Sequence, residues 1–298
     1  MPEAYVIATH QLTKRFGQFA AVEALDLNVR AHQITGFLGR NGAGKSTTIK
    51  MLLGMTRPTS GTGTLLGRNI EDPKENCEAR SSIAYVGEDK QLYAYFTVSE
   101  IIRFTRSFYA DWRPEVAERL LVDYELPPKR KVRALSKGMR TKLALLLALS
   151  RKPELLILDE PSEGLDPVAV EGLLQTLVRA ASEGTTIFFS SHQIAEVERI
   201  ADRVCILDHG TLVEDFSLDE LQQDYRRVTL GFATNAAVEA FRMAGIRHIR
   251  RAERQLSVLV RGNADAVAEH GRSMNAVSVD VAPISLREIF LESVQSES

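Results

Sequence analysis

The sequence predicts an α/β fold followed by a smaller α+β domain, and three apolar runs in the first part of the chain carry this prediction. Residues 34–38, 155–158 and 186–191 are typical of buried strands. A glycine-rich loop and a helical stretch follow the first run, and polar side chains follow the other two. Ligands collect at the carboxyl ends of strands in open α/β sheets. We therefore expect a binding site where these strands end.

The composition is that of an ordinary globular protein. The chain has 298 residues, which is enough for one large or two medium domains. Of these residues, 44% are apolar and 26% are charged. The net charge of −2 gives no argument for nucleic acid or an acidic membrane. Cys77 and Cys205 lack metal-ligand spacing, which favours a reducing cytosol. We expect no signal peptide, and the longest apolar run, residues 143–149, is too short to span a membrane.

The loop at residues 39–47 has the pattern G-x-x-x-x-G-K-[ST] between a predicted strand and a predicted helix. Its glycines let backbone N–H groups point inward as an anion nest, and the helix adds the positive end of its dipole. This context predicts a nucleoside-triphosphate site rather than a bare glycine turn. Lys45 would reach the β- and γ-phosphates, and the Ser46 hydroxyl would bind Mg²⁺. The nucleotide-binding residues expected here are Gly39, Asn41, Gly42, Gly44, Lys45, Ser46 and Thr47.

The segments on either side of this loop differ in character. Before it, we expect short strands at residues 6–8 and 24–29. Phe16 lies between them, and it either stacks on a purine ring or fills the core at a strand end. After the loop, a strand at residues 83–86 is followed by the carboxylate of Glu88. A helical subdomain over about residues 89–150 follows, with helices expected at 98–110, 114–122 and 139–150.

Two carboxylates, Asp159 and Glu160, come directly after the buried strand at residues 155–158. In P-loop enzymes an acid at this place holds the Mg²⁺ shell. A surface acidic pair is the alternative, which the upstream loop disfavours. The strand at residues 186–191 ends in His192, a candidate sensor of the γ-phosphate.

With these residues in place, the chain resembles the ATP-binding subunits of ABC transporters over roughly residues 5–216. Residues 135–139 occupy the place of the family's signature loop, of LSGGQ type, and residues 162–166 that of its D-loop. The resemblance implies a P-loop NTPase fold, in which a RecA-like core carries an antiparallel β subdomain and a helical subdomain. It places the ATP-binding domain at residues 1–216.

The resemblance also implies roles for individual residues. Glu160 would polarise the attacking water, and His192 would act as the switch histidine beside the catalytic Lys45. Phe16 would stack on adenine. Ser136 and Gly138 would touch the γ-phosphate bound to the opposite subunit, and Asp166 would link the two sites.

Two positions depart from the family pattern. The family usually has glutamine where this chain has Glu88, and a carboxylate there would keep metal binding intact. We therefore expect Ser46, Asp159 and Glu88 on the metal side of the site. Lys137 stands where the signature has glycine. Its ammonium group either approaches the phosphate or points to solvent, and the residues leave both open.

Residues 217–298 lie outside this core. The predicted strands and helices follow the order β-α-β-β-α-β, with one helix after them, which is the pattern of a ferredoxin-like sandwich. The expected elements span residues 228–232, 236–243, 246–249, 256–260, 264–270, 277–281 and 285–294. The many arginines suggest a solvated face or a subunit contact. No aromatic pattern for base stacking accompanies them, so we expect no nucleic-acid partner.

These observations favour an ATP-hydrolysing motor, with ATP and Mg²⁺, that drives export through a separate transmembrane permease. It would lie in the cytoplasm, on the inner face of the cell membrane, as a homodimer or a heterodimer. The alternative is a soluble ABC ATPase acting on ribosomes or DNA. Such proteins usually carry two cassettes or a long coiled coil, and this chain has neither. A regulatory module without turnover is disfavoured by the presence of Lys45, Asp159, Glu160 and His192.

Overall fold

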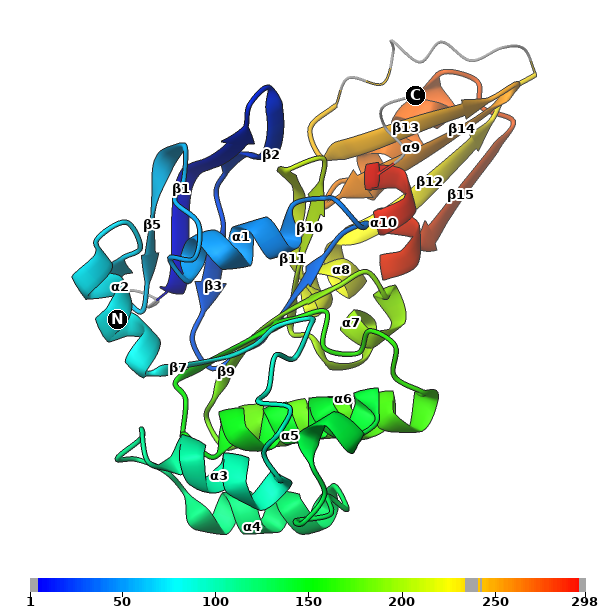
Figure 1. The fold of residues 1–298 in the computed structure, drawn as a ribbon. Coiled ribbons are helices and arrows are strands. Elements are labelled where there is room, and N and C mark those ends of the chain that lie inside the picture. Colours follow the sequence, from blue (N-terminus) through cyan, green and yellow to red (C-terminus); the bar gives the residue numbers. More distant parts are fainter. Residues whose placement is uncertain (1–4, 234–240, 242, 295–298) are drawn as a thin grey trace. The chain divides into compact units, whose positions relative to one another are not determined.

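The computed structural model describes residues 5–233, 241 and 243–294. They form two compact units that meet in the sequence between Asp215 and Phe216 (Figure 1). The larger unit holds the glycine-rich loop and the carboxylates that follow the central strands.

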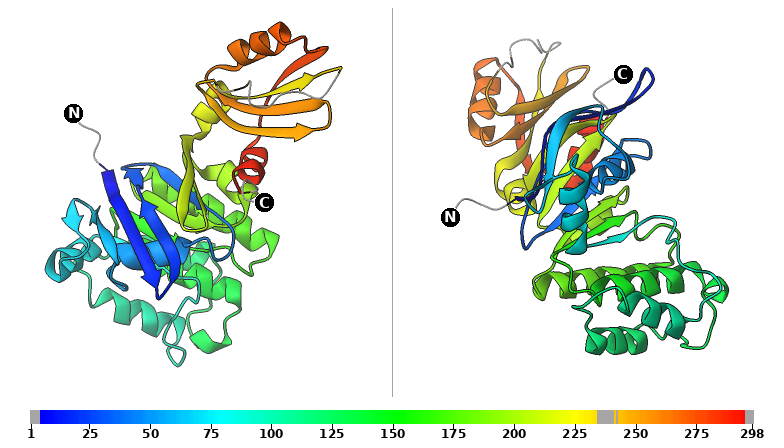
Figure 2. Two further views of the ribbon diagram at one scale, coloured as in Figure 1. Left: turned by 90° about the horizontal axis from the view of Figure 1, so that it is seen from above. Right: turned by 60° about the vertical axis from the view of Figure 1, so that its left-hand side comes forward.

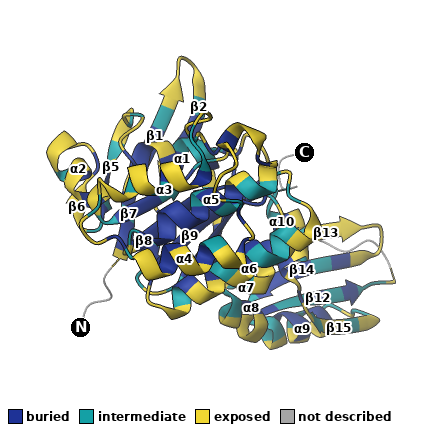
Figure 3. Ribbon diagram, turned by 60° about the horizontal axis from the view of Figure 1, so that its bottom comes forward, coloured by how far each residue is buried: buried dark blue, intermediate teal, exposed yellow. Residues whose placement is uncertain are grey.

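A six-stranded sheet forms the centre of the larger unit, in the order β11-β10-β4-β9-β8-β7. Its strands are β4 (Ile34–Leu38), β7 (Ile83–Val86), β8 (Leu155–Asp159), β9 (Thr186–Ser191), β10 (Arg203–Asp208) and β11 (Thr211–Ser217). The pairs from β10 to β7 are parallel, and β4, β8 and β9 are buried along their whole length. Figure 3 shows this burial for β8 and β9. Parallel strands end at the same edge of a sheet. The residues that follow β4, β8 and β9 therefore lie close together at that edge.

A second, antiparallel sheet is formed by β1 (Tyr5–Phe16), β2 (Phe19–Leu25), β3 (Asn28–Arg30), β5 (Ser60–Leu65) and β6 (Arg68–Asn69). The expected single strand at residues 24–29 is wrong. Ala24 has a positive φ of 46°, and Asp26 accepts hydrogen bonds from the backbone and side chain of Gln11, so the chain breaks between β2 and β3. The expected strand at residues 6–8 is the start of the much longer β1.

Helices pack against both faces of the central sheet. Helix α1 (Lys45–Leu52) contacts β8 as well as β2 and β5, so it lies between the two sheets. Helices α5 (Lys137–Leu149), α6 (Pro167–Ser182) and α7 (Ile194–Ile200) contact β7, β9 and β4 respectively. The short α2 (Pro73–Ser81) contacts β6 and β7.

The helical subdomain contains α3 (Val98–Arg106), α4 (Pro114–Asp123), the 3₁₀ turn η1 (Val132–Ala134) and α5. The expected helix at residues 98–110 is too long, because turns replace it after Arg106. Helix α5 begins two residues before the expected start, because Ser136 Oγ accepts the backbone N–H of Met139 at 3.1 Å and caps it.

The smaller unit contains an antiparallel sheet in the order β13-β14-β12-β15 (Figure 2). Its elements are α8 (Leu218–Asp224), β12 (Tyr225–Gly231), β13 (Ile246–Ala252), β14 (Gln255–Arg261), α9 (Ala264–Ser273), β15 (Ser278–Pro283) and α10 (Leu286–Val294). Most of the expected helix at residues 236–243 falls outside the described residues, so the ferredoxin-like arrangement stays a prediction. Helix α8 was not expected, although Ser217 and Glu220 form a capping box that the sequence displays.

Candidate nucleotide-binding site

The glycine-rich loop joins β4 to α1 at the edge of the central sheet. Gly44 caps α1 with a φ of +106°, and a Cβ atom there would lie 2.3 Å from the carbonyl oxygen of Ala21. Only glycine satisfies both the left-handed backbone and this close approach. The loop therefore turns tightly and presents Lys45 at the first position of the helix.

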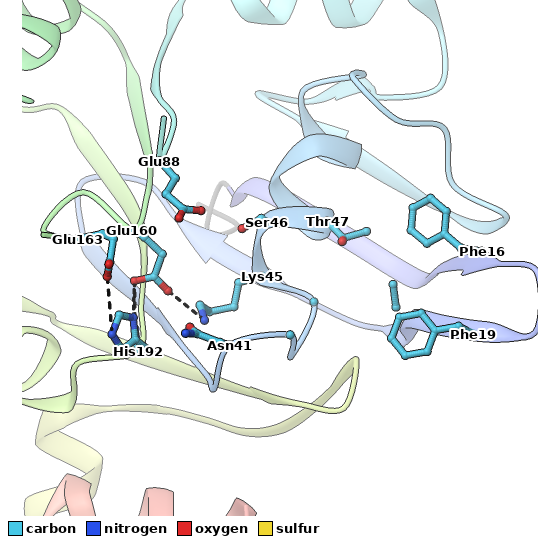
Figure 4. Close-up of a pocket in the computed structure, with 13 residues that line it drawn as sticks. Phe16, Phe19, Asn41, Lys45, Ser46, Thr47, Glu88, Glu160, Glu163 and His192 are labelled. Atoms are coloured by element: carbon cyan, nitrogen blue, oxygen red, sulfur yellow. Dashed lines mark hydrogen bonds and ion pairs between the residues drawn. The ribbon is translucent and has the colours of Figure 1, made fainter. Parts of the chain in front are cut away.

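A cavity of about 420 Å³ opens beside this loop (Figure 4), within the size range of small-molecule sites. The residues that line it are Phe16, Phe19, Ala21, Asn41, Gly42, Gly44, Lys45, Ser46, Thr47, Glu88, Glu160, Glu163 and His192. Asp159 lines an adjoining cavity together with Ser46 and Glu88. Gly39 does not line the first cavity, but its carbonyl oxygen accepts a hydrogen bond from Lys45.

Lys45 and Glu160 form a buried ion pair at the centre of the site. Lys45 Nζ lies 3.0 Å from Glu160 Oε1, and the two side chains are 5% and 8% exposed. The same ammonium group donates to the carbonyl oxygens of Gly39, at 2.7 Å, and Arg40, at 3.2 Å. The cation is thus held in the loop by acceptors that phosphate oxygens can replace.

Glu160 also contacts His192. Its Oε2 atom lies 2.9 Å from His192 Nδ1, and His192 Nε2 lies 3.9 Å from Glu163 Oε2 (Figure 4). The backbone of Glu160 has a positive φ of 45°, a conformation that costs about 1–3 kcal/mol for such a residue. Its N–H donates to Ser190 Oγ, and its carbonyl oxygen accepts the N–H of Glu163. These bonds hold the carboxylate in a strained position that faces both Lys45 and His192.

The metal side of the site contains hard oxygen donors. Ser46 Oγ donates to Asp159 Oδ1 at 3.0 Å, and Ser190 Oγ donates to the same atom at 2.7 Å. Across the described residues there is no group of three or more His, Cys, Asp and Glu residues arranged to hold a metal ion. Mg²⁺ usually binds through one or two carboxylates together with substrate phosphates, so this donor set fits it.

Two aromatic rings lie at the other end of the cavity (Figure 4). Phe16 and Phe19 are 55% and 64% exposed and pair across the hairpin between β1 and β2. Phe16 is therefore not a core residue, and its role in base stacking stays a prediction. Sequence reasoning missed Phe19, although two phenylalanines on either side of a glycine turn are a visible signal for a paired aromatic surface.

Lys90 was also missed, because a lysine after a strand usually points to solvent. It is only 7% exposed, and its Nζ atom donates to the carbonyl oxygen of Glu160 at 3.4 Å. Burial lowers the pKa of Lys90, and the nearby Lys137 lowers it further, while Glu88 opposes the shift. Lys90 thus adds a second amino group beside the carboxylates. Burial likewise raises the pKa of Tyr85, in the wall of the adjoining cavity, to about 12.

The predicted residues of the signature loop and the D-loop line neither cavity of their own chain. Ser136 and Asp166 are exposed and cap α5 and α6, and Gly138 lies in the first turn of α5. Lys137 lies over the D-loop, since a Cβ atom on Gly164 would come 2.4 Å from its Nζ atom. The signature and D-loop thus touch each other within one chain.

Known proteins are similar to this chain over the region that contains the site. A protein-family model described as "ABC transporter" matches residues 22–163. Bacitracin transport ATP-binding protein BcrA of Bacillus licheniformis is 37% identical over 225 residues, covering 74% of this chain and 73% of BcrA. Nod factor export ATP-binding protein I of Cupriavidus metallidurans is 36% identical over 221 residues, covering 72% of each. A solved structure titled "Structure of ATP binding subunit of ABC transporter" matches with a TM-score of 0.66 and 30% identity, over 73% of this chain and 92% of that one.

Proposed function

The chain belongs to the family of ABC transporter ATP-binding subunits, which bind and hydrolyse ATP, and on this premise we propose that it drives export through a separate membrane permease. The word "export" in the name of the Nod factor protein supports this direction, and the word "transport" in the name of BcrA supports a role in transport. Within the described residues, no helix has the length and apolar character needed to cross a membrane. We place the subunit on the inner face of the cell membrane, held there by the permease.

The observation that carries the proposal is the contact of Lys45 and His192 with the two oxygens of one carboxylate, Glu160. When ATP enters, its phosphate oxygens would take over Lys45 and free Glu160. Glu160 would then orient a water molecule for in-line attack on the γ-phosphorus and accept its proton. Lys45 would stabilise the charge on the transferring group, and His192 would hold the γ-phosphate.

The remaining residues of the site would bind and orient the nucleotide. Ser46, Asp159 and Glu88 would hold Mg²⁺, which neutralises phosphate charge when bound. Phe16 and Phe19 would flank the base, and the backbone N–H groups of the loop would surround the phosphates.

A second subunit would complete each site. Ser136, Gly138 and Asp166 lie outside the cavity of their own chain, yet the family resemblance assigns them to the nucleotide. Two-fold pairing would bring the signature loop of one chain to the phosphate loop of another and create two equivalent sites. We propose a homodimer, and a heterodimer with another ATP-binding subunit is the alternative.

We also propose that residues 1–216 form the ATPase domain and residues 217–298 an accessory domain. Within the latter, Arg227 pairs with Glu288 and Glu292, and Arg261 with Glu220. These arginines serve contacts inside their own unit, which supports a structural role rather than one in nucleic-acid binding.

Glu160→Gln tests the catalytic assignment. The amide keeps the size of the side chain but cannot accept the proton, so kcat should fall by about a hundredfold or more. ATP binding, measured by equilibrium titration, should remain. Glu198→Gln, an exposed change on α7, is the control. Full ATPase activity in Glu160→Gln would contradict the role of this residue.

A further inference from the structure

Glu196 is a buried acid beside the site that the proposed chemistry does not use. It lies in the first turn of α7, four residues after His192, and is 5% exposed. Burial raises the pKa of its carboxyl, against hydrogen bonds from Ser162 and Ser191 that lower it. Burying an acid in this way is costly unless its hydrogen bonds offset the cost.

One oxygen of Glu196 joins the loop after β8 to the end of β9. Ser162 Oγ donates to Glu196 Oε2 at 2.7 Å, and Ser191 Oγ donates to the same oxygen at 3.2 Å. Ser191 Oγ also accepts the backbone N–H of Gln193 at 2.9 Å, which leaves its own proton to point at Glu196. Ser162 follows the catalytic carboxylate by two residues, and Ser191 directly precedes His192.

The helix that carries Glu196 is fixed against the central sheet. Val197, the next residue, packs on Gly36 of β4 so closely that a Cβ atom on Gly36 would lie 2.5 Å from Val197 Cγ1. The carboxyl group therefore stands on a rigid element rather than on a loop, which is the arrangement that holds site residues in place.

Glu196 holds the loop that carries Glu160, and the strained backbone of this loop needs contacts that hold it in place. Glu160 has a left-handed backbone, and Ser190 Oγ accepts its N–H on the sheet side. On the other side the chain runs directly to Ser162, which is 1% exposed and donates to Glu196.

We propose that Glu196 is a positioning residue for ATP hydrolysis, which fixes Glu160 relative to His192 through the hydroxyl groups of Ser162 and Ser191. The inference rests on the proposed roles of Glu160 and His192. The other oxygen, Oε1, is buried and has no hydrogen-bond partner among the residues that the structure describes. Oε2 alone therefore accepts both hydrogen bonds. The role needs one acceptor oxygen at this position and does not need a negative charge.

The test compares Glu196→Ala with Glu196→Gln, whose amide oxygen can replace Oε2. Glu196→Ala should lower kcat by about tenfold or more, since misplaced reacting groups cost rate, while KM for Mg-ATP stays within about twofold. Glu196→Gln should recover most of the lost kcat. Glu198→Ala, an exposed change on the same helix, should match the unmodified protein. Circular dichroism and thermal melting establish that each variant is folded.

The serines provide a second route to the same answer. The double change Ser162→Ala with Ser191→Ala should lower kcat as much as Glu196→Ala, and adding Glu196→Ala to it should cost little more. Unchanged kcat in Glu196→Ala would overturn the proposal. A Glu196→Gln variant that is as inactive as Glu196→Ala would also overturn it. So would a decrease in kcat that matches the fraction of unfolded protein in each variant. Glu160→Gln is measured in parallel. Full ATPase activity in Glu160→Gln would contradict the proposed role of Glu160. If Glu160→Gln is inactive while Glu196→Ala is fully active, only the present inference is overturned.

Discussion

Glu88 tests how this chain departs from its family at the level of one side chain. By the family resemblance, it stands where glutamine is usual, and it lines both cavities together with Ser46. Because a carboxylate binds Mg²⁺ more strongly than an amide, Glu88→Gln should raise the Mg²⁺ concentration needed for half-maximal ATPase activity by several-fold. Glu118→Gln, at an exposed acid on α4 that lines neither cavity, is the control. An unchanged Mg²⁺ titration curve would show that Glu88 does not touch the metal.

Phe16 and Phe19 are expected to contribute to the affinity for the base of ATP. Stacking of an aromatic ring contributes about 0.5–1.5 kcal/mol beyond the area that it buries. Phe16→Ala should therefore raise KM for ATP by about twofold to tenfold, with Phe19→Ala showing a similar or smaller rise and kcat little changed in both. The same variants should bind inorganic triphosphate like the unmodified protein, because the loop binds phosphate. A loss of triphosphate binding would mean that the hairpin supports the loop instead.

The phosphate side of the site could be predicted from the sequence because its chemistry depends on local spacing. The loop at residues 39–47 and the acids after β8 belong to short motifs in which each residue type has one structural use. Lys90 and Glu196 could not be predicted, because their burial depends on elements far away in the chain. A lone lysine or glutamate is most often a solvated side chain.

The packing of α7 on the sheet gives a prediction for one element. A Cβ atom on Gly36 would overlap Val197, so Gly36→Ala should cost about 1–3 kcal/mol and lower the melting temperature by several degrees. Combining it with Val197→Ala should cost less than the two single changes added together. Gly172→Ala in α6, where no atom lies within 4 Å of the added methyl, is the control and should be neutral or stabilising. Additive losses would show that α7 is not held by this contact.

The helical subdomain carries an aromatic surface that suits a partner. The rings of Tyr93, Phe96, Phe104 and Phe108 contact one another in edge-to-face or tilted pairs, with centroids 5.0–5.5 Å apart. Tyr93, Tyr95 and Phe108 are 62%, 77% and 65% exposed. Exposed aromatic clusters are typical anchors of protein interfaces. Trp112, by contrast, is buried and belongs to the core.

Tyr93→Ala or Tyr95→Ala should accordingly weaken recruitment to vesicles that contain the permease, with KM for ATP unchanged. Tyr5→Ala, at an exposed tyrosine in the antiparallel sheet, is the matched control. Wild-type recruitment after alanine changes across the whole cluster would place the docking site elsewhere.

The buried strands and the helices of the helical subdomain could be predicted from periodicity, whereas α8 and several helix and strand ends could not. The apolar runs of β4, β8 and β9 are unambiguous because both faces are buried. Helix α3 ends at Arg106 although helical periodicity continues, and β2 ends at Leu25, one residue after Ala24 adopts a positive φ. Such ends are fixed by caps and bulges in three dimensions, which single-sequence patterns do not contain.

At the scale of the whole molecule, the separation of the two halves of the site predicts complementation between inactive chains. A Lys45→Ala chain would lack the phosphate cradle but keep Ser136, and a Ser136→Arg chain would keep the cradle but block the signature loop. Each should be inactive alone. If two copies pair with two-fold symmetry, a mixed dimer joins the intact cradle of one chain to the intact signature loop of the other. About half of the dimers in an equal mixture would then hold one competent site out of two, so ATPase activity should return to roughly a quarter of the unmodified level, provided that the sites act independently and pairing is random.

Glu160→Gln with excess Mg-ATP should elute as a dimer in size-exclusion chromatography, because unhydrolysed nucleotide bound by both chains stabilises the pair. Recovery of activity in the mixture would place each site between two chains. A monomeric elution profile at saturating ATP together with no recovery would instead indicate that this chain pairs with a different ATP-binding subunit.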